Sequence, residues 1–216
     1  MFFLLVSCQM PSANLSDEDM EVIDGYLGVD RGVNNIATTS EGNNWTSDEI
    51  DERRTWYQKR RDILQSVGTR SAKRALQRLS GKQARFQRDV NHTISKRIVS
   101  KAKARSSVIV LEDLSGIRER TTVRRQQRAR HSNWSFFQLR QFIEYKALIA
   151  GVSVIKVDPA YTSQTCSECG QCDRKNRNGS AFECRECGHS MDADKNAARN
   201  IAARGAVNSP MVASEA

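Results

Sequence analysis

Two cysteine pairs near the carboxyl end of this 216-residue chain restrict its fold more than any other feature of the sequence. Cys166 and Cys169 form one C-x2-C pair, Cys184 and Cys187 form a second, and 14 residues separate the pairs. Two thiolates at this spacing can converge on one ion, and two such pairs complete the tetrahedral ligand set of a closed, structural zinc site. The pattern therefore predicts a zinc ribbon whose metal stabilises the fold and takes no part in catalysis.

The remaining cysteines, Cys8 and Cys172, lack a partner at this spacing, although Cys172 could serve as an alternative ligand. Cysteines grouped for metal binding indicate a reducing compartment rather than a disulfide framework. No apolar run approaches the roughly 20 residues that span a bilayer. The apolar opening MFFLLVSCQM lacks the basic region of a secretory signal. We therefore expect a cytoplasmic protein without a membrane partner.

The positive charge of the chain is concentrated in its central segment. The net charge is +9 overall, but it is −8 for residues 1–50, +16 for residues 51–130 and +1 for residues 131–216. A solvated helical face is the alternative explanation, yet this concentration favours a partner with a phosphate backbone. Within this segment we expect four arginines to contact phosphates: Arg124, Arg125, Arg128 and Arg130.

Helical and strand-like stretches alternate along the chain. Residues 26–30 and 35–40 are typical of a β-hairpin, and residues 106–116 and 152–159 of buried strands. Residues 48–104 predict two or three basic helices, broken near Gly68 and Gly81. Further helices are expected up to Gly151 and over residues 194–204, with a frayed tail from Gly205. This alternation indicates the α/β class.

Three acidic residues stand at the ends of predicted elements. Asp30 and Glu112 each follow an apolar strand, and Asp194 opens the last helix. An acid at a helix start is often only a cap, which applies to both Asp192 and Asp194. Strands that end on acids can nevertheless gather carboxylates that hold Mg²⁺ or Mn²⁺, and two such ions can cleave a phosphodiester. A basic protein with this set of acids is typical of a nuclease.

Four motifs in this order resemble the carboxyl-terminal half of the transposon-encoded TnpB (OrfB) proteins, relatives of the compact type V CRISPR effectors. They are GVDRGVNNIATT, VIVLEDLSG, KVDPAYTSQTCSECG and DADKNAARNIA, and they cover roughly residues 25–205. The resemblance implies an RNase H-like (RuvC) nuclease fold of the α/β class with an inserted zinc ribbon. It also implies that Asp30, Glu112 and Asp194 are catalytic, with Asp192 as the competitor for the third position.

The resemblance further implies a division of the chain. A short segment, 1–24, precedes a nuclease core, 25–160, that contains a basic helical insertion at 48–104. A zinc ribbon, 161–190, the last RuvC helix, 191–205, and a tail, 206–216, follow. Members of the family usually carry a long amino-terminal half that grips guide RNA, whereas about 25 residues precede the first motif here. We therefore expect a chain truncated at its amino terminus.

The activity implied by the family is RNA-guided cleavage of DNA. It requires one structural Zn²⁺, two catalytic Mg²⁺ or Mn²⁺ ions, and guide RNA and DNA as partners. Two alternatives remain open from the sequence. One is a remnant or regulator that binds nucleic acid through the basic helices and ribbon without cutting, and the other is a transposase that also joins strands.

Overall fold

The computed structural model describes residues 24–32, 34–114 and 136–208. Its main sheet contains the strands β1 (Gly25–Asp30), β2 (Asn35–Thr39), β3 (Asn44–Thr46), β4 (Ser107–Glu112) and β5 (Val154–Val157). The strand order is β3-β2-β1-β4-β5. β1, β4 and β5 run parallel, whereas β2 and β3 are antiparallel to their neighbours. The α/β class and the predicted hairpin of β1 and β2 are thus confirmed.

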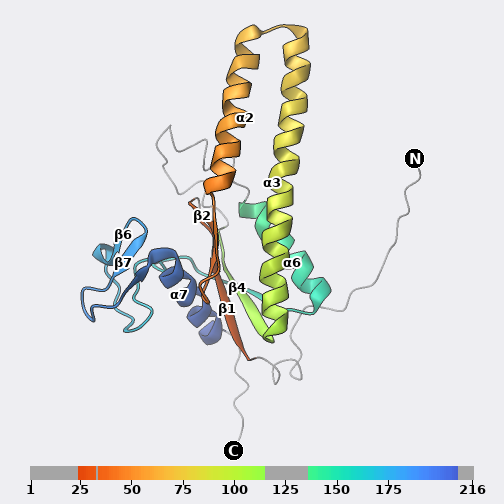
Figure 1. Ribbon diagram of the computed structural model, residues 1–216. Helices are drawn as coiled ribbons and strands as arrows, with labels where there is room; N and C mark the ends of the chain where they lie inside the picture. Colours follow the sequence, from red (N-terminus) through yellow and green to blue (C-terminus); the bar gives the residue numbers. More distant parts are fainter. Residues whose placement is uncertain (1–23, 33, 115–135, 209–216) are drawn as a thin grey trace, which may run out of the picture.

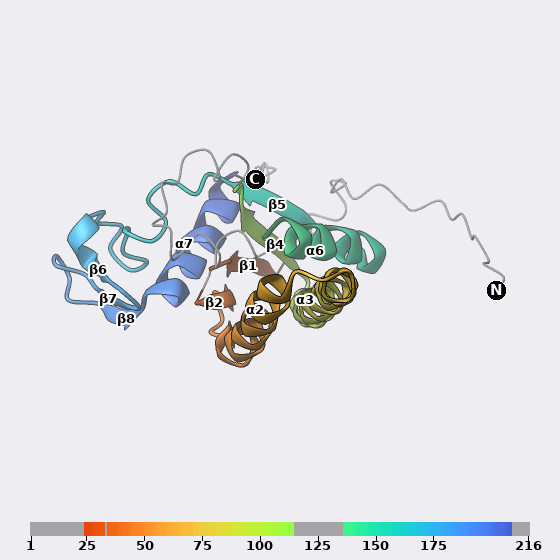
Figure 2. The ribbon, with the colours of Figure 1, turned by 90° about the horizontal axis from the view of Figure 1, so that it is seen from above.

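Helices cover both faces of the sheet. α3 (Arg70–Ala104) and α6 (Phe136–Ala150) pack on one face, and α7 (Ala193–Asn208) packs on the other (Figures 1 and 2). Side chains alternate along β4, so that Ile109 and Leu111 face α3 and α6, while Val110 meets Ile201 of α7. β4 is therefore buried on both faces, as its continuous apolar run predicted.

Gly28 of β1 allows α7 to approach the sheet closely. A Cβ atom at this position would lie 2.0 Å from the backbone oxygen of Ala198. At the other end of the helix, a Cβ on Gly205 would lie 2.4 Å from the Cγ2 atom of Val110. Gly205 is buried, and α7 continues to Asn208, so the expectation of a frayed tail from Gly205 was wrong. Packing against β4 holds this end of the helix.

The basic insertion forms a helical hairpin of α2 (Asp48–Val67) and α3, which projects beyond the sheet (Figure 1). α2 ends at Gly68, whose left-handed φ of 66° suits glycine, as predicted. The predicted break at Gly81 was wrong, because α3 runs through it without interruption. A glycine inside a helix costs about 1 kcal/mol. Packing of α2 against α3 offsets that cost: Tyr57 and Leu79 are buried, and Arg61 of α2 donates to Gln83, two residues beyond the glycine.

A second, three-stranded sheet forms the ribbon beside α7. It contains β6 (Arg177–Asn178), β7 (Ala181–Glu183) and β8 (Ser190–Asp192), and a short 3-10 helix, η1 (Arg174–Asn176), precedes it. β8 leads directly into α7, so the ribbon immediately precedes the helix that carries Asp194. In the part of the chain that the structure describes, no helix combines the length and apolar character needed to cross a bilayer.

Candidate metal centre and carboxylate site

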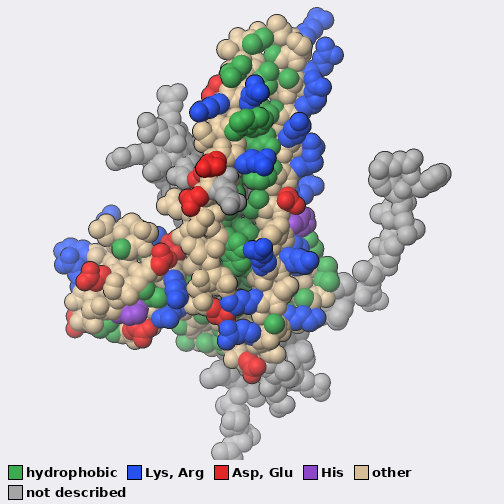
Figure 3. Space-filling view, in the orientation of Figure 1, with side chains coloured by type: hydrophobic (Ala, Val, Ile, Leu, Met, Phe, Trp, Pro, Cys, Tyr) green, Lys and Arg blue, Asp and Glu red, His purple; other side chains and the backbone are tan. Residues whose placement is uncertain are grey.

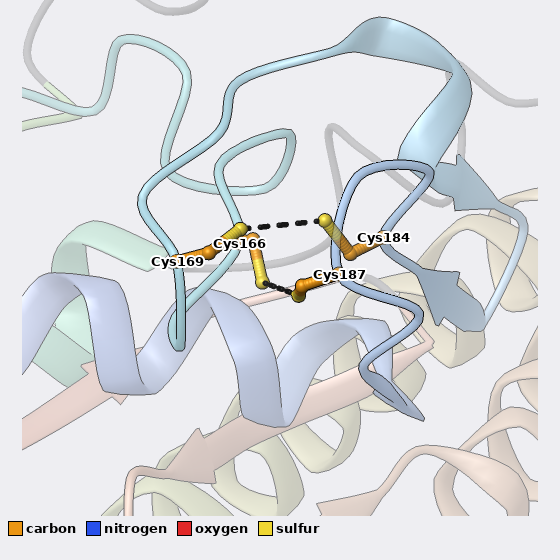
Figure 4. A group of neighbouring side chains, drawn as sticks. All are labelled: Cys166, Cys169, Cys184 and Cys187. Atoms are coloured by element: carbon orange, nitrogen blue, oxygen red, sulfur yellow. Dashed lines mark hydrogen bonds between the residues drawn. The ribbon is translucent and has the colours of Figure 1, made fainter.

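The four predicted cysteine ligands converge in the ribbon (Figure 4). The Sγ atoms of Cys166 and Cys187 lie 3.7 Å apart, those of Cys169 and Cys184 lie 3.6 Å apart, and all four lie within 4.8 Å of one another. Four sulfurs bound tetrahedrally at about 2.3 Å from one zinc ion would be roughly 3.8 Å apart, so the cluster has the dimensions of a metal centre. Cys172 is exposed and does not belong to this cluster.

Backbone N–H groups and neighbouring thiols shift the pKa values of the cluster in opposite directions. The backbone N–H of Cys187 lowers the pKa of Cys184 to about 7 although burial opposes this shift, whereas, despite the backbone N–H of Gln171, contacts with the other thiols raise the pKa of Cys169 to about 12. The side chain of Asn176 links the segments that carry the two cysteine pairs. Its Nδ2 donates to the carbonyl of Gln164, and its Oδ1 accepts from the backbone N–H of Arg185. Asn176 is only 2% exposed, so the protein shields this connection from solvent.

Asp30 and Glu112 lie side by side at the carboxyl edge of the main sheet. Val29 of β1 pairs with Leu111 of the parallel strand β4, so the next residue of each strand, Asp30 and Glu112, are level with each other. Two carboxylates from two adjacent parallel strands therefore meet at one sheet edge. Glu112 is buried, and its Oε1 accepts a hydrogen bond of 2.5 Å from the hydroxyl of Thr162.

Asp194 enters the same region from α7. Its Oδ1 accepts from Nη2 of Arg177 at 2.9 Å, and its Oδ2 accepts from Nδ2 of Asn35 at 2.8 Å. Asp192 has a different position, because its Oδ1 accepts the backbone N–H groups of Asp194 and Lys195 and thereby caps α7. Of the two candidates, Asp194 is the one whose charge acts on Asp30.

Electrostatics link the three acids. Burial, followed by the charges of Glu112 and Asp194, raises the pKa of Asp30 to about 7. Burial also raises the pKa of Glu112, although Thr162 and Arg31 oppose that shift. The repulsion that Glu112 and Asp194 exert on Asp30 is one that a divalent cation would relieve, and hard oxygen donors of this kind suit Mg²⁺ or Mn²⁺.

The three carboxylates are nevertheless less tightly gathered than the cysteines. Among the described residues, only the four cysteines place three or more ligand atoms all within 4.8 Å of one another. The structure thus brings Asp30, Glu112 and Asp194 to one edge without closing them around a common point. Asn200 holds α7 to the chain after β5, because its Nδ2 donates to the carbonyls of Thr162 and Thr165.

Several polar residues at this site were not predicted from the sequence. Arg31, 5% exposed, donates from Nη2 to the backbone oxygen of Glu112 at 2.5 Å. Asn35, Thr162 and Arg177 contact the acids directly. Their positions in the sequence could have indicated two of these residues, because Arg31 follows a predicted acid and Asn35 begins the next strand. The four predicted phosphate contacts lie outside the described residues: Arg124, Arg125, Arg128 and Arg130.

Comparison with known proteins agrees with this arrangement. Residues 19–115 match the OrfB_IS605 family model, described as "Probable transposase", and residues 136–201 match the model described as "Cas12f1-like, TNB domain". The CRISPR-associated endodeoxyribonuclease Cas12f1 of Sulfoacidibacillus thermotolerans is 47% identical over 129 residues, which are 59% of this chain and 29% of that protein. The TnpB-like protein MJ0751 of Methanocaldococcus jannaschii is 33% identical over 149 residues, 67% of this chain and 53% of that protein.

The fold also has a close counterpart among solved structures. The cryo-EM structure of the Cas12f1-sgRNA-target DNA complex superposes with a TM-score of 0.65 at 24% identity, covering 82% of this chain and 49% of that one. The class is therefore that of α/β proteins with a cysteine ribbon, whose fold resembles that of the Cas12f1 structure. Within this class, the chain belongs to the TnpB/OrfB family. It spans about half, or less, of the length of these curated relatives.

Proposed function

We propose that the chain is the catalytic part of a transposon-associated, RNA-guided DNA endonuclease with an RNase H-like (RuvC) arrangement. The observation that carries the proposal is the meeting of Asp30 and Glu112 at one edge of two parallel strands, with Asp194 brought to the same edge by α7. The mixed sheet with β1 at its centre and helices on both faces supports the RNase H-like assignment. The endodeoxyribonuclease Cas12f1 relative supports the reaction.

In this proposal the three acids hold divalent cations and the four cysteines hold zinc. At such a site, Mg²⁺ or Mn²⁺ supplies an activated water and stabilises the leaving oxygen of the cleaved phosphodiester. Thr162 and Arg31 hold Glu112 from two sides, through its carboxylate and its backbone oxygen. The zinc site positions the start of α7, because β8 of the ribbon continues into that helix. The ribbon therefore contributes to catalysis through structure.

The outer face of α3 supplies a surface for the nucleic acid. Its basic residues greatly outnumber its single acid, Asp89, and ten of them are exposed. These ten are Arg70, Lys73, Arg74, Arg78, Lys82, Arg85, Arg88, Lys96, Arg97 and Lys103. Figure 3 shows Lys and Arg side chains along the outer edge of the hairpin. A helix of 35 residues extends roughly 50 Å, so this face can follow a phosphate backbone over many contacts.

Guide RNA and DNA are the proposed partners. The matched Cas12f1 structure is a complex with sgRNA and target DNA. We also propose the division of this chain into a nuclease core, 25–160, a ribbon that ends with β8 at Asp192, and the closing helix α7, and a cytoplasmic location. The described part of this division agrees with the separate cores of the sheet and of the ribbon.

Cleavage of labelled DNA tests the proposal. Zinc-loaded protein is incubated with single-stranded and duplex DNA and with Mg²⁺, with and without RNA transcribed from its own flanking sequence. We expect Mg²⁺-dependent cleavage that Asp30→Ala abolishes, while circular dichroism and zinc content stay unchanged. Binding without cleavage under all of these conditions would instead support a nucleic-acid-binding protein that does not cut.

A further inference from the structure

Arg177 connects the ribbon to the carboxylate site. Its Nη2 donates to Oδ1 of Asp194 at 2.9 Å, and its Nε donates to the carbonyl of Gly179 at 3.1 Å. The other oxygen of Asp194 accepts from Asn35 at 2.8 Å. Both oxygens of Asp194 therefore have a protein donor, and one of these donors carries a full positive charge.

The backbone of Arg177 is fixed, whereas its side chain has room to move. The residue is the first of β6 and pairs with Phe182 of β7. It directly follows the buried Asn176, which links the segments that carry the two cysteine pairs. The side chain of Arg177 is 34% exposed, compared with 13% for that of Asp194. The guanidinium can therefore leave Asp194 toward solvent without any rearrangement of the ribbon.

A divalent cation and Arg177 make opposing demands on Asp194. A cation held by either oxygen of Asp194 would lie close to the guanidinium that donates to Oδ1, which would place two positive charges near each other in a partly buried site. Repulsion at that distance is poorly screened away from bulk water. Binding of one cationic group at Asp194 therefore opposes binding of the other.

We propose that Arg177 is an exchangeable counter-ion of Asp194, which a divalent cation displaces, so that the ribbon sets the cation affinity of the carboxylate site through this one side chain. The inference rests on the proposed function, because it requires Asp194 to be a cation ligand. The exchange predicts that removal of Arg177 strengthens cation binding, whereas removal of a residue that only supports the structure of the site would weaken cation binding.

The test measures Mn²⁺ binding to zinc-loaded protein, by calorimetry and by the electron paramagnetic resonance signal of free Mn²⁺. We expect Arg177→Gln to bind Mn²⁺ about two- to fivefold more tightly than wild type, the range for an ion pair that is partly exposed to solvent. Arg185→Gln removes one exposed positive charge from the same ribbon and should leave the affinity unchanged. Arg177→Lys keeps the positive charge but lacks the planar guanidinium group, so this variant tests whether the hydrogen-bonded pairing with Asp194, and not charge alone, limits Mn²⁺ binding. An affinity above wild type in this variant supports exchange.

Adding Asp194→Asn to Arg177→Gln locates the effect, since the gain in Mn²⁺ affinity should disappear. Equal or weaker Mn²⁺ binding by Arg177→Gln overturns the exchange and leaves the proposed nuclease site intact. A gain that survives Asp194→Asn overturns it as well, as does Arg177→Lys binding with wild-type affinity. Absence of Mn²⁺ binding in both wild type and Arg177→Gln would overturn the carboxylate site itself together with the exchange.

Discussion

Asp192 and Asp194 are separated by one residue, yet they make different contacts. Asp192 accepts hydrogen bonds from two backbone N–H groups at the start of α7. Asp194 instead accepts hydrogen bonds from Asn35 and Arg177, and its charge raises the pKa of Asp30. The sequence motif left both residues open as the third acid. The distinction depends on the direction in which the first turn of the helix presents each side chain, which supports Asp194 as the proposed third ligand.

A first prediction concerns Asp30 and pH. Its folded-state pKa of about 7 lies above the ordinary value of 3.8, so the protonated form favours folding. That contribution is complete below about pH 4 and is lost as the pH rises through 7. In zinc-loaded protein without Mg²⁺, Asp30→Asn should therefore raise the free energy of unfolding at pH 8, by on the order of 1 kcal/mol, and much less at pH 5.

Urea titrations at the two pH values measure this difference. Asp89→Asn is the matched control, because Asp89 is exposed on α3. Its effect should be small at both pH values. A stabilisation by Asp30→Asn that is equal at pH 5 and pH 8 would contradict the pKa and leave only a packing explanation. The same substitution should abolish cleavage, so stability and activity are expected to change in opposite directions.

At the level of elements, a second prediction concerns the contact between β1 and α7. Gly28→Ala places a methyl group 2.0 Å from a backbone oxygen of α7, so the helix must shift. We expect a loss of about 2–3 kcal/mol in the free energy of unfolding and lower DNA cleavage, because α7 carries Asp194. Gly25→Ala in the same strand is the control, since its nearest neighbour would be Ser107 Oγ at 3.9 Å. Equal stability of the two variants would refute the close approach.

A third prediction concerns the basic face of α3. Arg70, Arg74 and Arg78 are spaced four residues apart, so they follow one another on one face at roughly 6 Å intervals. Replacing all three by glutamine, which has a similar helix propensity, should reduce the slope of log K against log salt for duplex binding by about 3. Affinity should fall for every sequence tested, because backbone contacts carry no base information.

The control for this experiment removes the same charge elsewhere. It replaces three exposed basic residues outside α3 by glutamine: Lys156, Lys175 and Arg185. Filter binding or fluorescence anisotropy between 50 and 200 mM salt, conditions under which such contacts are resolved, gives both slopes. If both triple variants lower the slope equally, the chain responds to net charge, and α3 is not a specific phosphate surface.

At the level of the whole molecule, a fourth prediction tests whether zinc positions the carboxylate site. Cys187→Ser removes one of four ligands and should lose zinc, which disorders the ribbon and with it the start of α7. Cleavage should fall by roughly a hundredfold, since small displacements of catalytic groups have effects of that size. Cys172→Ser, at an exposed cysteine outside the cluster, is the control. Full activity in zinc-free Cys187→Ser protein would show that the two sites are independent.

Local chemistry made much of this protein predictable from its sequence. The spacing of Cys166, Cys169, Cys184 and Cys187 anticipated the cluster, because a C-x2-C turn brings two sulfurs together regardless of what surrounds it. Apolar runs anticipated the strands, and Gly68 and Gly151 ended their helices as expected, since both adopt positive φ. Periodicity and turn chemistry are properties of short segments, so they can be recognised in the sequence without knowledge of the fold.

Other features depend on segments that are far apart in the sequence. Gly81 did not interrupt α3, because packing against α2 outweighed its local preference, and α7 extended past Gly205 because β4 lies beneath it. The contacts of Asp194 with Asn35, 159 residues away, and with Arg177 across the ribbon have no local signature. Long-range packing determines which polar groups meet and how strongly burial shifts the pKa of Asp30. Only the tertiary structure fixes these two features, because both depend on segments that are distant in the sequence.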